Sequence, residues 1–582
     1  MFSFLAKVKG YCSDVWFLIG TDRSKIPAII FIFLFSSALD LIGLGLIGGY
    51  ITAISDDYMI QESAGFLQEI IQFVDPEKSL TIFGVALISI FSIKGVVGIG
   101  AQRLILSFSL RQMASLRVRA FRAIQALPFE EFLKQGSAEY LRVVSSYTSQ
   151  FNTSLLLILK LAGDAFLVIV VIGFLSILAP LFVVAMVVIG ISLVLFYDRL
   201  FRQKLRKSGV EMNEGDNLVT VGVQEGSRGF KEMRILGREK IFLDVVERGA
   251  IQSMTARLFI GVVSASPRFF VEWIVVIFVV SFASISLADG KSAESLYAVL
   301  GMFALAAIRL GPLVSQAMHA TATLRSARPA ISGLRAQFSY FESVRHSSPA
   351  KSNFDRTVLF SDLVLNQIEV KYSNSSLPVF TDVSLHIRRG DRIAIVGESG
   401  IGKTTLIDTL LGLIPPAKGQ IFFNGQDLKN CVDMWRSKVA YLPQETFILD
   451  GTISQNIALN SFDEFIDKTK LDEAIRRCRL DELVASYPKG LRTRLGEMGS
   501  FMSGGQRQRV ALARALYHDR EVLILDEATS ALDQGTEAEI INEIKHLGVD
   551  FTVILISHKL DTLDFCSKVF RLEKKSLSEV FS

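Results

Sequence analysis

Cysteine is scarce in this sequence, and the few cysteines present are scattered. Four occur in 582 residues, at Cys12, Cys431, Cys478 and Cys566, and no two of them form a C-x-x-C pair. This spacing argues against a disulfide scaffold and against a thiolate metal cluster, so we expect ordinary reduced thiols.

Charged residues are also few. They make up 21% of the chain, half of the residues are hydrophobic, and the mean hydropathy is +0.40. Soluble domains carry more charge, so this composition indicates a membrane protein. The net charge of +4 gives no general affinity for polyanions, and we predict no nucleic-acid partner.

Long apolar runs are abundant, and they lie in the first half of the chain. Most of them reach the roughly 20 residues that a spanning helix needs. The six runs are 26–54, 80–110, 155–178, 181–197, 258–287 and 296–314. The fourth and sixth are near the lower limit, and buried core helices are the alternative for them. The first is too long for a signal-peptide core, so we expect it to stay in the mature protein.

The basic residues set the orientation. The segment before the first run is basic and the segment after it is acidic, which predicts a cytoplasmic N-terminal segment, 1–25. Six crossings then return the C-terminal half to the cytoplasm. The connections 111–154 and 198–257 are predicted to be cytoplasmic helical extensions, with solvated loops as the alternative. The basic residues before the first run are Lys7, Lys9, Arg23 and Lys25.

A polar stretch divides the chain. We predict a transmembrane domain over 26–342, a linker over 343–360, and a soluble α/β domain over 361–582.

The soluble domain contains a phosphate-binding pattern, G-x-x-x-x-G-K-[ST], between a strand-like and a helix-like run. Its glycines leave backbone N–H groups free to converge on phosphate oxygens. Lys403 would add positive charge at the terminal phosphates, and the Thr404 hydroxyl would ligate Mg²⁺. A plain glycine-rich turn is the alternative for the pattern alone. The pattern and its flank comprise Gly397, Glu398, Ser399, Gly400, Ile401, Gly402, Lys403, Thr404 and Thr405.

Two further strings follow the phosphate loop. A strand-like run, 522–525, ends in Asp526 and Glu527. Asp526 is placed to hold Mg²⁺, and Glu527 to orient or deprotonate an attacking water. The other string begins a helix that runs to Leu516, and it reads Met502, Ser503, Gly504, Gly505 and Gln506.

Together these strings resemble the nucleotide-binding domain of ATP-binding cassette (ABC) transporters, and the six apolar runs look like the exporter-type membrane domain fused to it. The resemblance implies an α-helical six-span membrane domain joined to an α/β P-loop nucleotide-binding domain. It also implies an ATPase, with ATP and Mg²⁺, coupled to transmembrane transport.

The same resemblance implies roles for single residues. Tyr372 would stack on adenine, with a core or surface tyrosine as the alternative. Gln444 would sense Mg²⁺ and face the membrane domain. His558 would reach the γ-phosphate, with a capping or core histidine as the alternative. The loop 530–533 would join two ATP sites. The implied catalytic set is Lys403, Gln444, Glu527 and His558.

Two positions depart from the family pattern, and neither removes a ligand. Met502 replaces the usual leucine, and Ile401 replaces a common small polar residue. In this family the Ser503–Gln506 string of one domain covers the ATP held by the phosphate loop of another. One set of motifs in the chain therefore implies a half-transporter that forms a homodimer, with a heterodimer as the alternative.

Ionisable residues inside the apolar runs bear on the substrate, because isolated charges are costly at membrane depth. Lys160 can pair with Asp164, and Arg268 with Glu272, at i+4 spacing. Lys94 and Arg309 have no partner nearby in the sequence. We hypothesise that Lys94, Arg268 and Arg309 line a cavity for an anionic head group such as a diphosphate, with ion pairs between helices as the alternative. The full set is Asp40, Lys94, Arg103, Lys160, Asp164, Arg268, Glu272 and Arg309.

The layout is similar to that of bacterial flippases of lipid-linked oligosaccharides. The similarity rests on Lys94 in the second run, Pro267-Arg268 in the fifth, and 309–312 (RLGP) in the sixth. It implies a polyprenyl-diphosphate-linked oligosaccharide as substrate and the bacterial cytoplasmic (inner) membrane as location. It also implies an external helix with an apolar face, with the packing of a plain external loop as the alternative. The apolar residues are Phe66, Leu67, Ile70, Ile71 and Val74.

Two other functions remain open. A general exporter of drugs, lipids or peptides predicts a cavity dominated by aromatic residues. An ATP-gated channel or regulatory subunit more often has a broken catalytic set, whereas every catalytic position is intact here.

Overall fold

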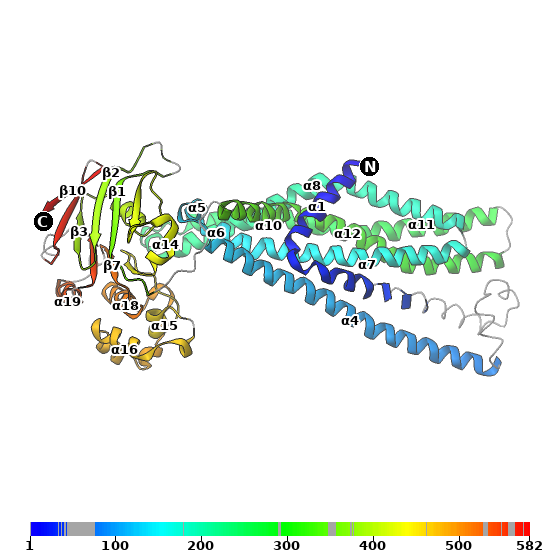
Figure 1. Ribbon diagram of the computed structural model, residues 1–582. Coiled ribbons are helices and arrows are strands. Elements are labelled where there is room, and N and C mark those ends of the chain that lie inside the picture. The colour runs from blue at the N-terminus through cyan, green and yellow to red at the C-terminus, as the bar shows by residue number, and fades with distance from the viewer. Residues whose placement is uncertain are drawn as a thin grey trace. The chain divides into compact units, whose positions relative to one another are not determined.

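The structure is a computed structural model, and it forms two compact units (Figure 1). The helical unit comprises 1–127 with 135–345, and the α/β unit comprises 128–134 with 346–582. The described residues are 2–32, 34–35, 38–39, 42, 76–178, 180–288, 293–346, 357–372, 375, 377–460, 462–527, 534–546, 548, 550–556, 565–573 and 575–581.

The helical unit is built from long helices. They are α1 (Phe2–Ile19), the 3₁₀ turn η1 (Gly20–Lys25), α4 (Pro76–Gln125), α6 (Ser137–Leu141), the π-helical turn η3 (Arg142–Tyr147), α7 (Thr148–Leu178), α8 (Pro180–Arg228), α9 (Phe230–Leu236), α10 (Lys240–Ala265), α11 (Pro267–Ala288) and α12 (Ala293–His346).

Several of these helices are longer than the hydrocarbon core of a bilayer is thick. Helix α4 has 50 residues, which gives a length of about 75 Å against a hydrocarbon core of about 30 Å. Three stretches in the described part are long and apolar enough to cross a membrane: Gly84–Gln125, Ser137–Ile169 and Lys240–Ile277. They overlap the second, third and fifth predicted runs. The other three runs include residues or side chains outside the described part.

The N-terminal segment is helical and packs against the rest of its unit. Tyr11 and Leu18 of α1 are buried in a cluster with Phe151 of α7 and Leu334 of α12. Arg119 of α4 donates to the carbonyl of Leu18 at 3.1 Å. One face of α1 is therefore core, not solvent.

Helices α8 and α10 approach each other at backbone distance. A Cβ on Gly215 would lie 2.6 Å from the carbonyl oxygen of Gly249, so any larger side chain would push the helices apart. Asp216 and Arg257 form an ion pair of 2.7 Å beside this contact. Small residues here let these two long helices pack as a pair, in line with the prediction that 198–257 is helical.

The α/β unit holds two sheets. Its strands are β1 (Asp362–Val370), β2 (Phe380–Arg388), β3 (Arg392–Val396), β4 (Lys418–Phe423), β5 (Gln426–Asp427), β6 (Val439–Leu442), β7 (Val522–Asp526), β8 (Thr552–Ile556), β9 (Lys568–Glu573) and β10 (Ser576–Phe581). An antiparallel sheet has the order β2-β1-β4-β5, and the second has the order β10-β9-β3-β8-β7-β6, parallel from β9 to β6.

The helices of this unit surround the sheets. They are α5 (Phe129–Leu133), α13 (Lys403–Leu410), α14 (Leu428–Arg436), α15 (Ile453–Ala458), α16 (Lys468–Arg477), α17 (Asp481–Ser486), α18 (Gly504–Tyr517) and α19 (Gln534–Lys545), with short 3₁₀ turns between them. Phe129 of α5 packs against the core of this unit, although 128–134 lies far from 361–582 in sequence.

Strand β7 joins two hydrophobic cores. Val522 and Ile524 face the first core, which contains the sheets, α13 and α14, whereas Leu523 and Leu525 face the second, which contains α15, α16 and α18. All five residues of β7 are buried. A strand buried on both faces is continuously apolar, which is how 522–525 reads in the sequence.

Trp435 anchors the first core. Its ring lies 5.6 Å from those of Phe360 and Phe423, and its Nε1–H donates to the carbonyl of Leu410 at 2.6 Å. The side chain is fully buried. It therefore fills volume and also satisfies a buried carbonyl near the end of α13.

We predict that Trp435→Ala lowers the free energy of unfolding by about 3–5 kcal/mol, because it leaves a cavity and an unpaired carbonyl. The measurement is the unfolding midpoint of the full chain in detergent. Trp16→Ala is the matched control: Trp16 is 49% exposed, so its loss should cost less than about 1 kcal/mol. Equal losses in the two variants would contradict the prediction.

Candidate functional site

The phosphate loop follows a buried strand, as the sequence predicts. Strand β3 buries Ile393 and Ile395 and delivers the chain to Gly397. Helix α13 then begins at Lys403 with Gly402 as its N-cap and no side-chain cap. The first N–H groups of α13 therefore lack side-chain partners, which suits them to phosphate oxygens.

Gly402 is required by the shape of the loop. Its φ is 110°, and a Cβ there would lie 2.6 Å from Cγ1 of Val379. Only glycine meets both conditions, so the backbone itself forms the surface that a phosphate would approach.

Lys403 is folded over this loop. Its Nζ donates to the carbonyls of Gly397 and Glu398 at 2.9 and 3.2 Å and lies 3.8 Å from Oε1 of Glu527. Burial lowers the pKa of Lys403, and the nearby carboxylates of Glu527 and Asp526 oppose that shift. The amino group of Lys403 thus lies next to the catalytic acid predicted from the sequence.

Glu527 is held from two sides at the end of β7. In addition to Lys403, the amide Nε2 of Gln444 donates to its Oε2 at 3.0 Å. The φ of Glu527 is 48°, a left-handed conformation that few residues other than glycine adopt. Backbone strain of this kind is typical of functional positions. Three of the four predicted catalytic residues therefore meet here, and His558 lies outside the described residues.

Asp526 lies one residue earlier, at the tip of the same strand. Burial raises its pKa, and a hydrogen bond of 3.2 Å from the Tyr441 hydroxyl to Oδ2 opposes that shift. The same surroundings raise the pKa of Tyr441. Tyr441 is a site residue that no local sequence pattern indicates, because only the tertiary structure brings β6 beside β7.

A second missed residue is Asp408 of α13. Burial raises its pKa to about 6, and the charge of Asp526 adds to the shift. Its sequence signal is a lone acid inside the buried run 406–410 (LIDTL).

The oxygen donors present fit Mg²⁺. Thr404, Gln444 and Asp526 supply a hydroxyl, an amide oxygen and one carboxylate, all hard donors. Within the described residues no group of three or more His, Cys, Asp or Glu side chains could hold a metal ion. Mg²⁺ that arrives with a nucleotide needs only one or two protein ligands besides phosphate and water, so this sparse set is sufficient.

Tyr372 lies beside the phosphate loop. Its hydroxyl is 3.1 Å from Oγ1 of Thr405, and its ring packs against the first core. The structure therefore brings this predicted adenine contact to the loop, from 33 residues away in sequence.

The Ser503–Gln506 string caps a helix on the second core. Ser503 is the N-cap of α18: its Oγ accepts from the Gln506 N–H at 3.2 Å, and its own N–H donates to Gln506 Oε1 at 2.9 Å. Met502, in place of the usual leucine, is buried in that core. The string and the phosphate loop thus belong to different cores of one unit.

Comparisons with known proteins agree with this geometry. The family described as "ABC transporter" matches residues 380–530, and the family described as "ABC transporter transmembrane region" matches residues 26–312. The chain belongs to the ABC transporters. One membrane region and one ATP-binding domain on the chain give this ABC transporter the layout of an exporter half-transporter, and it is an ATPase coupled to transport.

The chain is similar to named relatives and, in its fold, to a solved structure. It is 28% identical to an ATP-dependent lipid A-core flippase of Polaromonas sp., over 86% of this chain and 84% of that protein. It is 40% identical to the chloroplastic ABC transporter B family member 29 of Arabidopsis thaliana, over 38% of this chain but only 35% of that relative. The fold matches a bacterial Atm1-family ABC exporter with ATP bound, with a TM-score of 0.75, 20% identity, and coverage of 96% of this chain and 95% of that one.

We expect Glu527→Gln to lower ATP hydrolysis by on the order of 100-fold or more, because the amide cannot take a proton from water. ATP binding should persist, since Lys403 and the loop are unchanged. Turnover and equilibrium nucleotide binding are measured on the full chain. Glu573→Gln, at an exposed position of β9, is the control. Unchanged hydrolysis in Glu527→Gln would refute the assignment.

Asp408 predicts a pH effect. Its folded pKa of about 6 lies above its ordinary value of 3.8, so the folded state binds the extra proton. The group is destabilising where both states are ionised, above about pH 6, and this penalty disappears as pH falls toward 4. Asp408→Asn should therefore raise the unfolding midpoint at pH 8 in EDTA, and the gain should vanish near pH 4. A gain independent of pH would contradict this origin.

Proposed function

We propose that this ABC exporter is a translocase that flips an amphipathic lipid with an anionic head group across the bacterial cytoplasmic membrane. A polyprenyl-diphosphate-linked oligosaccharide is the substrate that we infer. The observation that carries this proposal is a cationic groove on α4.

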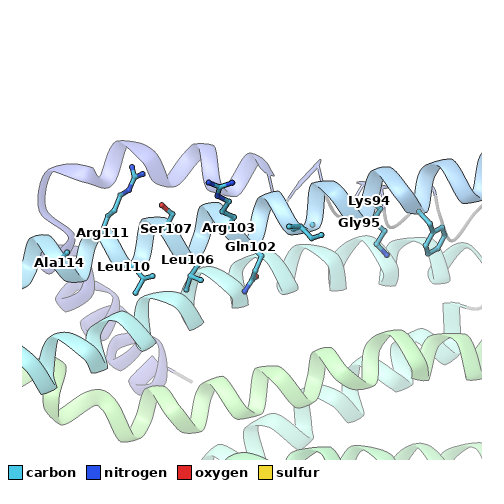
Figure 2. A pocket seen from close by; sticks show the side chains of 12 residues that line it. Lys94, Gly95, Gln102, Arg103, Leu106, Ser107, Leu110, Arg111 and Ala114 are labelled. Carbon is cyan, nitrogen blue, oxygen red and sulfur yellow. The ribbon is translucent and has the colours of Figure 1, made fainter.

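The groove runs along one face of α4, is open along its length, and has a volume of about 1110 Å³ (Figure 2). Its residues recur at three- and four-residue spacing, as one helix face requires. The Cβ positions of Gly95 and Gly98 have nothing within 4 Å, so the groove is open there. The lining residues are Phe91, Lys94, Gly95, Gly98, Ile99, Gln102, Arg103, Leu106, Ser107, Leu110, Arg111 and Ala114.

Three cations and no acid line this groove. The spacing of Lys94, Arg103 and Arg111 separates them by roughly 13 and 12 Å along the helix axis. In Figure 2, Arg103 and Arg111 extend from one side of α4, and Lys94 extends from the other. Arg103 and Arg111 form no ion pair with any residue in the described part.

This pattern fits an anionic amphiphile. Basic side chains near the cytoplasmic end of a span attract phosphate groups, and the apolar residues between them can lie against hydrocarbon chains. A general exporter of apolar compounds predicts an aromatic lining, whereas Phe91 is the one aromatic residue among those lining the groove. The lining thus favours an anionic lipid.

In the described part, the other ionisable residues of the apolar runs lie outside this groove, and their contacts differ. Arg268 donates to Glu272 at 2.8 Å, so that pair is confirmed and its charge is balanced. Lys160 and Asp164 form no direct ion pair, and Oδ2 of Asp164 is buried without a hydrogen-bond partner. The side chain of Arg309 and the segment 66–74 lie outside the described residues, so their roles stay predictions.

Relatives that align along most of the chain support a lipid substrate. Two of them are named ATP-dependent lipid A-core flippases, from Polaromonas sp. and Ralstonia nicotianae. The head group that we infer here, a diphosphate carrying a glycan, rests on the cations of α4 and on the sequence resemblance.

The ATP site implies the working assembly. We infer a homodimer with both termini in the cytoplasm. Tyr372 would stack on adenine, and Ser503 to Gln506 of one copy would close over the nucleotide on the phosphate loop of the other. Thr404, Gln444 and Asp526 would hold Mg²⁺, which would supply positive charge for the phosphates. Glu527 would then take the proton of the attacking water, with His558 at the γ-phosphate.

The test compares ATP turnover of the reconstituted protein with and without an undecaprenyl-diphosphate-linked oligosaccharide. We expect stimulation by this lipid and none by phosphatidylcholine. In the triple variant Lys94→Gln, Arg103→Gln, Arg111→Gln, we expect the stimulation to fall about tenfold or more, because three charge contacts are lost. Basal turnover should stay unchanged.

Lys207→Gln is the matched control, because it removes an exposed cation outside the groove. Full stimulation of the triple variant would exclude the groove as the head-group site. Stimulation of the unaltered protein by neutral drugs, and not by the anionic lipid, would exclude the proposed substrate.

A further inference from the structure

Helices α10 and α11 meet at a joint formed by Ser266 and Pro267. Proline has no N–H, so the helical hydrogen bond to the carbonyl four residues earlier, that of Val263, cannot form. Val263 is 3% exposed. A buried carbonyl without a donor costs free energy, so this one needs a partner from elsewhere.

Tyr197 of α8 supplies that partner. Its hydroxyl donates to the carbonyl of Val263 and lies 2.7 Å from Oγ of Ser266. The Ser266 hydroxyl is itself 3.3 Å from the same carbonyl. A side chain 66 residues away thus replaces the backbone N–H that Pro267 lacks.

The ring of Tyr197 also contacts both sides of the joint. It packs in one cluster with Val263 of α10, and its centroid lies 6.3 Å from that of Phe270 on α11. On its own helix it lies 4.8 Å from Phe201. The tyrosine is 6% exposed, so its position is fixed by packing as well as by hydrogen bonds.

The next residue links α8 to α12. Asp198 accepts two hydrogen bonds from Arg325, at 3.0 and 3.2 Å, and the side chains are only 8% and 13% exposed. Helix α12 continues to His346, where the polar stretch before the α/β unit begins. Of these two consecutive residues of α8, Tyr197 contacts the joint and Asp198 contacts α12.

We propose that Tyr197 is a positioning residue for transport, which holds the α10–α11 joint at one angle and makes that angle depend on where α8 lies. A backbone hydrogen bond inside a helix cannot respond to a neighbouring helix. The bond from Tyr197 can, because sliding α8 against α10 withdraws the hydroxyl from the carbonyl. The joint then loses the donor that stiffens it and bends more easily.

The experiment uses the full chain in lipid nanodiscs and four forms: unaltered, Tyr197→Phe, Pro267→Ala, and the double variant. One readout is hydrogen exchange of peptides covering 262–270, where the amides of Ser266, Phe269 and Phe270 bond within the joint. The other is ATP turnover. Neither readout uses a transported substrate, so the result is independent of the lipid proposed above.

Tyr197→Phe should speed exchange in this segment by about five- to tenfold, the effect of losing one hydrogen bond, and should lower ATP turnover. In Pro267→Ala the restored N–H can bond to Val263, so adding Tyr197→Phe should change neither readout. Ser266→Ala, which leaves the Tyr197–Val263 bond, should give an intermediate exchange rate. It also tests the proposal if Tyr197→Phe folds poorly.

Tyr147→Phe is the matched control. Tyr147 is likewise buried in the helical unit, at 8% exposure, and its hydroxyl makes no hydrogen bond with the described residues. It should leave exchange at 262–270 unchanged. Equal effects of Tyr197→Phe with and without Pro267 would overturn the proposal, and so would unchanged exchange in the proline background.

Discussion

The ATP site depends on the burial of one strand. Because β7 is apolar on both faces, it can be shared by the first and second cores of the α/β unit, and its end is fixed by both. Asp526 and Glu527 follow directly, so their positions are set by packing and not by a flexible loop. The contacts of Glu527 with Lys403 and Gln444 then join this strand end to the phosphate loop and to the segment after β6.

Much of this site could be predicted from the sequence because its parts are local patterns. The glycines of 397–402 and the apolar run of β7 each report their own backbone environment, and the structure places them as predicted. Asp408 and Tyr441 were missed because their importance arises only when β6, β7 and α13 come together. Lys160 and Asp164 form no direct ion pair, because i+4 spacing permits such a pair but does not require it.

In the helical unit, too, local features can be predicted from the sequence, whereas contacts between helices cannot. Pro267 predicts a helix break directly from the sequence. The tyrosine that replaces the missing hydrogen bond belongs to another helix, so no local sequence pattern indicates it. The groove on α4 is the opposite case, since a single helix carries all its lining residues. Its cations recur periodically in the sequence, and Lys94 is the one among them that the sequence predicts to line a substrate cavity. Pro267 leaves the carbonyl of Val263 without its helical donor, and Tyr197 of another helix supplies one.

The central claim is that each ATP site is completed by a second copy, and co-expression of two inactive variants tests it most directly. One carries Lys403→Ala in the phosphate loop, and the other carries Ser503→Arg at the start of α18. In a mixed dimer, the intact loop of the second chain faces the intact Ser503 string of the first, so ATP hydrolysis should partly return. If the mixture stays as inactive as the separate variants while mixed dimers are present, each chain hydrolyses ATP within itself and the account is wrong.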